Sequence, residues 1–277
     1  MEGVSPLRIY GTSVRGASNL ITAWGRVGGV GVGTVACLKE RLGATEFGEI
    51  DPCEFFESPV SVREGMVQEA RPPRSKFHHW ENPKGDDLLL FVADGEPQRR
   101  RYEYASLILQ RAAQCKAKAI IAVCGIPTVL QDAKSPKVFG VVNDVELARN
   151  LDAFGVLPLD HPNLARMTLH RGVPVETTPT SELTSMNALL LALAARRGLP
   201  GTYLLAEVPY YAIAAANPDS CRAVLRVLTA MLDLDIDLRS IDETVRTTVV
   251  ECRRRARGIP RRAPMANTFP LSWHGSD

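Results

Sequence analysis

A glycine-rich segment is the feature of this sequence that most suggests chemistry. Residues 25–33 read Gly-Arg-Val-Gly-Gly-Val-Gly-Val-Gly, and Gly28, Gly29, Gly31 and Gly33 are close enough together for the backbone to approach a phosphate group. A strand is predicted before the segment and a helix after it, as in a degenerate dinucleotide-binding pattern. The same glycines also suit close packing of the helix against a strand or against another subunit. The pattern therefore leaves two alternatives, a ligand loop and a packing loop.

Acidic residues at predicted strand ends form a second candidate group. Asp94 and Glu96 follow one predicted strand, Cys124 and Gly125 follow another, and Glu207 follows a third. Because the carboxyl ends of parallel strands lie at one edge of a sheet, this places Glu96, Gly125 and Glu207 beside a cleft. Converging carboxylates can carry out acid–base chemistry. Acids in loops can equally accept hydrogen bonds from backbone N–H groups, so we assign no catalytic residue on this pattern.

The histidines and cysteines do not indicate a metal site. None of the six cysteines forms a Cys-x-x-Cys pair, and His78 and His79 stand in tandem without a metal-ligand spacing. The sequence also lacks the Walker, kinase, zinc-protease and serine-hydrolase signatures. We therefore expect no metal and no cofactor, and cysteines that pack as small apolar side chains.

Arginines gather in two places along the chain. The net charge is +2, and residues 253–277 hold six arginines against a single acid, which leaves the remainder mildly acidic. An acidic body is not expected to bind nucleic acid. Arg99, Arg100 and Arg101 form another run at the start of a predicted helix, where the helix dipole disfavours cations. The tail is either a solvated terminus or a contact for nucleic acid, a membrane surface or an acidic protein, and the run at the helix start is either solvated or a site for an acidic partner.

The chain carries no recognisable targeting segment. Its first residues lack the basic and apolar regions of a signal peptide. The longest apolar run, residues 188–195, is far shorter than the ~20 residues that span a bilayer. We therefore expect a cytoplasmic protein that does not contact membranes.

The elements that must position these residues alternate between strand and helix. Strands are predicted at 19–24, 87–93, 118–124 and 202–208, and helices at 32–42, 102–112 and 183–197, from Asn217 as a cap, and from Asp237. The strands run apolar without alternation, as in sheets that are covered on both faces. This order indicates an α/β fold with a mixed, largely parallel central sheet flanked by helices.

The domain organisation follows from length and composition. A chain of 277 residues with 45% apolar residues can bury one sizeable core. We expect a single α/β domain over residues 1–252, followed by a flexible arginine-rich tail over residues 253–277. Residues 58–87 contain several prolines and are expected to form a hairpin or an ordered loop.

Several segments, taken in order, resemble the proteasome assembly chaperone 2-like family. No single segment is diagnostic, but their order and spacing together are specific. The resemblance covers roughly residues 18–240. The matching segments are residues 23–31, 38–42, 46–52, 55–56, 71–72, 95–97, 186–198, 204–211, 217–218 and 235–237.

The resemblance implies a fold like that of the purine nucleoside phosphorylases, self-association and a non-enzymatic role. Some relatives dock on the α-ring of the proteasome through a C-terminal hydrophobic–tyrosine–any residue motif. This chain ends with residues 273–277, Trp-His-Gly-Ser-Asp, so such docking is not expected. Arg26 also stands where family members often carry an acid, which puts any role of that acid in doubt.

Two functional hypotheses result. The first is a non-enzymatic homo-oligomeric scaffold or chaperone-like protein, which binds copies of itself and a protein partner. The alternative is a protein or enzyme that binds a small ligand, such as a nucleoside or a phosphate compound, in the cleft at the strand carboxyl ends. An open cleft beside residues 25–33, Glu96 and Glu207 would favour the alternative.

Overall fold

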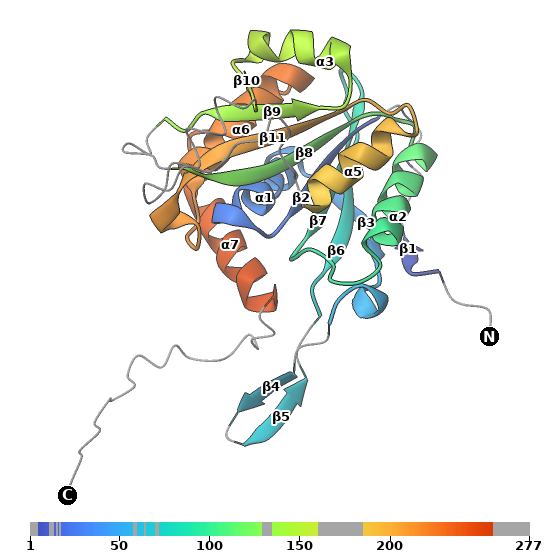
Figure 1. The fold of residues 1–277 in the computed structure, drawn as a ribbon, viewed down its shortest axis with the longest axis vertical. Helices are drawn as coiled ribbons and strands as arrows, with labels where there is room; N and C mark the ends of the chain where they lie inside the picture. The colour runs from blue at the N-terminus through green and yellow to red at the C-terminus, as the bar shows by residue number, and fades with distance from the viewer. Residues whose placement is uncertain are drawn as a thin grey trace, which may run out of the picture.

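A nine-stranded sheet forms the centre of the molecule (Figure 1). The structure is a computed structural model, and it describes residues 5–10, 14, 16, 18–57, 60–63, 65–69, 72–128, 135–159 and 185–256. Helices cover both faces of the sheet, so the predicted α/β class is confirmed.

The strands lie in the order β1-β3-β6-β7-β2-β8-β11-β9-β10. The four central strands β7, β2, β8 and β11 are parallel, and β6, β3 and β1 on one side and β9 on the other are added antiparallel. The four apolar strands predicted from sequence are these four. The strand bounds are β1 (Leu7–Ile9), β2 (Ser18–Trp24), β3 (Thr45–Ile50), β6 (Ser75–Trp80), β7 (Asp87–Ala93), β8 (Ala117–Thr128), β9 (Val138–Val142), β10 (Leu157–Pro158) and β11 (Gly201–Pro209).

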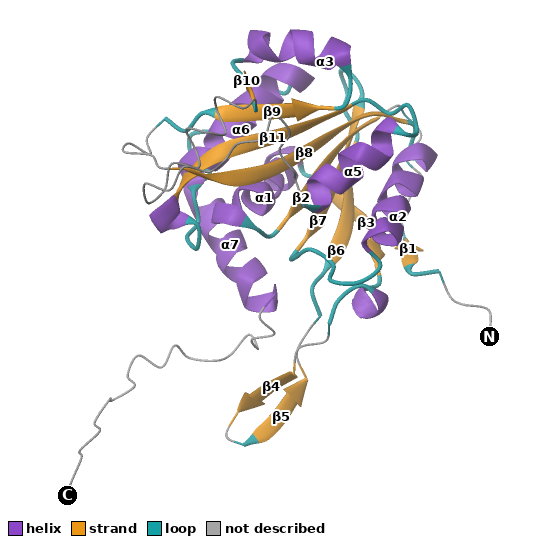
Figure 2. Ribbon diagram, in the orientation of Figure 1, coloured by secondary structure: helices purple, strands orange, loops and turns teal. Residues whose placement is uncertain are grey.

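The helices form two layers, as the colouring in Figure 2 makes clear. One face of the sheet carries α1 (Val30–Leu42), α6 (Pro218–Leu232) and α7 (Asp242–Ala256). The other carries α2 (Arg101–Gln114) and α5 (Met186–Ala195), and α3 (Val145–Asn150) lies by β9. Short 3-10 turns are η1 (Val27–Gly29), η2 (Pro52–Glu54), η3 (Leu151–Phe154) and η4 (Tyr210–Ala212).

Alternate residues of the central strands supply two separate cores. In β7, Leu88 and Leu90 belong to the cluster under α1, whereas Leu89 and Phe91 belong to the cluster under α2. Successive side chains of a strand point to opposite faces of the sheet. A strand covered on both faces therefore needs apolar residues at every position, which is the continuous pattern in the sequence.

Two predicted helix starts differ from the structure, and the start of α6 agrees with it. The last helix begins at Asp242, because the Asp237 carboxylate accepts from the backbone N–H of Arg239 in a turn before the helix. Asn217 occupies the N-cap position of α6, which begins at Pro218 as expected, but its side chain makes no cap hydrogen bond; its amide donates to the carbonyls of Ala212 and Ala215, 2.9 Å away in each case. Helix α5 is capped by Ser185, and the predicted positions 183 and 184 lie outside the described residues.

The segment expected to be a hairpin or an ordered loop contains three strands. β4 (Val60–Arg63) and β5 (Met66–Glu69) form a separate two-stranded hairpin. β6 follows and lies inside the main sheet between β3 and β7. Sequence analysis missed β6 because its polar residues do not follow the apolar pattern of the other central strands.

The arginine-rich tail, proposed to begin at residue 253, overlaps α7. The guanidinium of Arg253 donates to the carbonyls of Ile213 and Ala215, at 3.2 and 3.3 Å. We expect a chain truncated after Ala256 to have the melting temperature of the full chain. Truncation after Cys252 removes these hydrogen bonds and should therefore lower the free energy of unfolding by about 1 kcal/mol. Thermal melts of both truncations test this. Equal melting of the two truncated chains would show that these bonds contribute nothing.

Candidate functional site

The glycine-rich segment lies within the interface between α1 and the sheet. A Cβ atom on Gly31 would lie 2.6 Å from the carbonyl oxygen of Val123 in β8. A Cβ atom on Gly33 would lie 2.9 Å from the Sγ of Cys221 in α6. These glycines are needed because backbone and neighbouring helices approach closely at both positions.

Gly28 and Gly29 lead into α1 with φ angles of 60° and 62°, which favour glycine. A Cβ atom on Gly28 would lie 2.9 Å from a methyl group of Val208 in β11. A Cβ atom on Gly29 would lie 2.2 Å from a methyl group of Val249 in α7. Protein atoms thus fill the space beside the glycines, which favours the packing loop over the ligand loop.

Glu96 joins three elements just beyond the end of β7. Its Oε2 accepts from the Arg26 guanidinium at 2.7 Å, and its Oε1 accepts from the backbone N–H of Met186, the first residue of α5, at 3.0 Å. Arg101 at the start of α2 lies 3.7 Å from Oε2. Burial alone would lower the pKa of Arg26, but the hydrogen bond to Glu96 and its negative charge raise it. Arg26 and Glu96 therefore form a stable ion pair.

Buried polar groups surround the first turn of α5. The Ser185 hydroxyl donates to the Tyr203 hydroxyl at 3.3 Å, and the Asn187 amide donates to the carbonyl of Val123 at 3.3 Å. Burial raises the pKa of the Cys124 thiol, which keeps the thiol protonated. A protonated thiol is a poor nucleophile, so this cluster is not arranged for thiolate chemistry.

Gly125 and Glu207 both lie inside strands, which the predicted strand 202–208 already implied for Glu207, whereas the expectation that Gly125 follows the end of its strand is wrong. β8 and β11 pair without interruption from Ile120 and Gly201 to Thr128 and Pro209, beyond the ends of their neighbours. A Cβ atom on Gly125 would lie 2.7 Å from the carbonyl oxygen of Val27. Gly125 is therefore a second point of close approach between η1 and the sheet.

The Glu207 carboxylate holds the segment that enters β9. Its Oε2 accepts from the backbone N–H of Lys137 at 2.9 Å, and the Glu207 N–H donates to the Lys137 carbonyl at 3.0 Å. β2 and β8 lie between β7, which Glu96 follows, and β11, which contains Glu207. Within the described part of the chain the two carboxylates share no partner, so the structure does not bring them together as an acid–base pair.

Asp94 and the first basic run are also bound by groups of this chain. Asp94 accepts from the backbone N–H of Arg74 at 2.9 Å, and burial raises its pKa. Arg100 forms ion pairs with Glu54 and Glu103. The run at the start of α2 thus contacts acids of its own chain, whereas the sequence suggested solvent or an acidic partner.

The β4–β5 hairpin is an exposed apolar element that the sequence did not single out as a site. Val62 and Val67 lie directly opposite each other and are 68% and 74% exposed, and Met66 is 65% exposed. The hairpin projects from the body of the molecule in Figure 1. The sequence signal that could have identified the hairpin is the alternation of Val60 and Val62 before Gly65, with Val67 after it.

The described residues offer neither a metal site nor a membrane-spanning helix. No group of three or more histidine, cysteine or acidic side chains there could hold a metal ion. None of the helices in the described ranges combines the length and apolar character that crossing a bilayer requires.

Comparison with known proteins relates the chain to one family and one fold. The family model described as PAC2 family matches residues 20–254. No curated protein matches the chain. Solved structures with low sequence identity share the fold.

Three of these structures illustrate the similarity. PbaB of Pyrococcus furiosus, described as an archaeal proteasome activator, is 20% identical with a TM-score of 0.68, over 90% of this chain and 97% of that one. A proteasome-assembly chaperone homologue of Mycobacterium tuberculosis is 17% identical with a TM-score of 0.62, over 86% and 94%. A PAC2 family protein of Streptomyces avermitilis is 19% identical with a TM-score of 0.60, over 88% and 100%.

Proposed function

Because the chain belongs to the PAC2 family, we propose that it is a non-enzymatic, homo-oligomeric scaffold with a chaperone-like role in the cytoplasm. Similar structures described as a proteasome activator and as a proteasome-assembly chaperone homologue support a role in protein assembly. The observation that carries the proposal is the projecting β4–β5 hairpin with its exposed valine pair.

The hairpin has the properties of a protein-binding element. Among the described residues, β4 and β5 pair only with each other, so both strands have an edge whose N–H and C=O groups can pair with a further strand. A two-stranded hairpin alone is marginally stable in water and needs a further strand or a packed apolar face. We propose that a second copy of this chain covers Val62 and Val67, which agrees with the self-association implied by the family resemblance.

Replacing both valines by serine tests this proposal. We expect light scattering to give an oligomer for the natural chain and a mass near 30.3 kDa for Val62→Ser/Val67→Ser at the same concentration. Burial of a valine side chain is worth about 1.5–3 kcal/mol, so loss of both valines removes about 3–6 kcal/mol and should weaken association by at least about a hundredfold.

Val145 supplies the matched control for this experiment. It is 68% exposed, like Val62, but lies at the start of α3. Val145→Ser should therefore leave the oligomer unchanged. A natural chain that is a monomer at micromolar concentration, or a double variant that remains an oligomer, would contradict the proposal.

The small-ligand alternative at the strand carboxyl ends has weaker support. Glu96 binds Arg26 and α5, Glu207 binds the backbone of Lys137, and the glycines are packed against β8, α6 and α7. The expectation about docking through residues 273–277 concerns positions outside the described residues. It stays a prediction, as does the flexible tail.

A further inference from the structure

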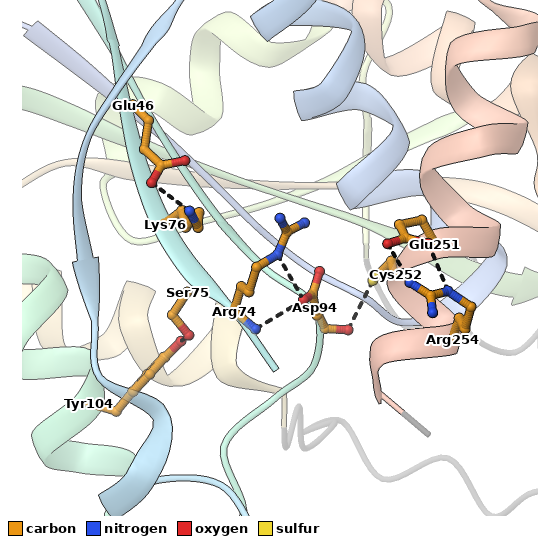
Figure 3. A network of polar contacts seen from close by, with 9 residues as sticks. All are labelled: Glu46, Arg74, Ser75, Lys76, Asp94, Tyr104, Glu251, Cys252 and Arg254. Atoms are coloured by element: carbon orange, nitrogen blue, oxygen red, sulfur yellow. Dashed lines mark hydrogen bonds and ion pairs between the residues drawn. The ribbon is translucent and has the colours of Figure 1, made fainter. Parts of the chain in front are cut away.

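A cavity of about 220 Å³ lies between α1, α7 and the strands β3, β6 and β7. We call it the α1–α7 cavity. Val32 and Val35 of α1 and Val92 of β7 form its apolar part. Pockets for drug-sized ligands have volumes of about 300–1,000 Å³, so this one suits a smaller molecule. Figure 3 shows some of the polar residues that line it, among them Glu46, Arg74, Lys76, Asp94 and Glu251.

The three carboxylates that line the cavity already have cationic partners. Glu46 accepts from the Lys76 ammonium at 2.5 Å, and Asp94 accepts from the Arg74 Nε at 3.4 Å. Glu251 pairs with Arg254 at 2.7 Å, and Arg254 is not part of the lining (Figure 3). The acids therefore do not make the cavity a site for a cation.

Positive charge remains available in the lining. Lys39 of α1 makes no ion pair or side-chain hydrogen bond with any described residue. Arg74 contacts Asp94 through its Nε, and its two terminal nitrogens have no hydrogen-bond partner within the described ranges. Since the lining holds three basic and three acidic residues and Arg254 neutralises one of the acids, one positive charge is in excess.

His78 adds an independent observation. It lines the cavity from β6, it is only 4% exposed, and its Nδ1 has no hydrogen-bond partner among the described residues. Burial and the nearby Lys39 lower the pKa of His78 to about 4, so the ring is neutral near pH 7. A buried nitrogen without a partner costs about 1–3 kcal/mol, and because almost no surface of Nδ1 is accessible, a bound polar group can remove that cost only when the ring turns toward the cavity.

We propose that the α1–α7 cavity binds a small organic anion. Lys39 and the terminal nitrogens of Arg74 hold its carboxylate or phosphate group, His78 supplies a hydrogen bond, and Val32 and Val35 contact its apolar part. This site lies on the α1 face of the sheet, so it is distinct from the ion pair of Glu96 with Arg26 beside α5. The inference goes beyond the proposed scaffold function and does not depend on it.

Binding of two probes to the full chain tests the proposal. The probes are inorganic phosphate and 3-methylbutanoate, titrated at constant ionic strength and followed by calorimetry and by the ¹⁵N NMR signals of His78. We expect saturable binding of at least one probe together with a shift of those signals. Binding of phosphate alone assigns a phosphate ligand, and binding of 3-methylbutanoate alone assigns a carboxylate ligand.

Lys39→Met removes the unpaired charge from an exposed helix position and should weaken binding about tenfold, or about 1.4 kcal/mol. The matched control is Lys118→Met, which removes a surface charge at the start of β8 and should change binding less than about twofold. The proposal is overturned if neither probe saturates in the millimolar range, or if the two variants bind alike.

Discussion

Replacing Gly31 by valine is expected to lower the free energy of unfolding by about 3 kcal/mol, which overpacking of a close contact can cost. The Cβ atom would lie 2.6 Å from the Val123 carbonyl oxygen and 3.1 Å from the Cβ of Ala23. Both neighbours belong to central strands, so α1 would have to move away from the sheet. Helix propensity acts in the opposite direction, because valine is the better helix former. A loss of stability therefore reports the close approach.

Substitutions at two other glycines distinguish steric contact of the added side chain from backbone strain as the cause of that loss of stability. A Cβ atom on Gly95 would have nothing within 4 Å, and its φ is not in the left-handed region, so Gly95→Ala should be neutral. Gly43 also has open space but a φ of 70°, so Gly43→Ala should cost only about 1 kcal/mol from backbone strain. Denaturant unfolding of the three variants gives the comparison. A Gly31→Val chain as stable as Gly95→Ala would show that α1 does not pack as described.

Glu96→Ala is expected to lower the free energy of unfolding by about 2 kcal/mol. The change leaves the half-buried guanidinium of Arg26 and the first N–H of α5 without their acceptor. A hydrogen bond to a charged group contributes about 1.5–3 kcal/mol, and the partial exposure of Arg26 favours the lower part of that range. Glu96→Gln keeps an oxygen that can accept from Met186 and should cost about half as much.

A double-mutant cycle with Arg26→Ala isolates the ion pair. If Glu96 joins the elements as described, the double variant should be about 1 kcal/mol more stable than the sum of the single changes predicts. Additive losses would mean that the two side chains act independently. An unchanged melting temperature in Glu96→Ala would mean that the carboxylate is free for another role, and would reopen the strand-end cleft as a ligand site.

The sequence alone determined the four central strands of the sheet and the family. After Asp87 and Lys118, residues 88–93 and 119–124 run apolar without a break, and such short runs are typical of strands covered on both faces. The order and spacing of the segments that resemble the PAC2 family are likewise properties of the sequence, and the match to residues 20–254 confirms that reading. Both features can be read from the order of residues along the chain, without knowledge of which distant segments meet.

The tertiary structure alone decided what the candidate side chains do. In the sequence, Glu96 and Glu207 were both acids expected at strand ends. In the structure the Glu96 carboxylate binds Arg26 and the start of α5, whereas the Glu207 carboxylate binds the backbone before β9. In the sequence, His78 and His79 are a tandem pair without a metal-ligand spacing, and their roles appear only once β6 lies between β3 and β7. Alternation along that strand then sends His78 into the α1–α7 cavity and His79 to Asp87. The partners of all these side chains are distant in sequence, and local periodicity carries no information about which distant segments will meet.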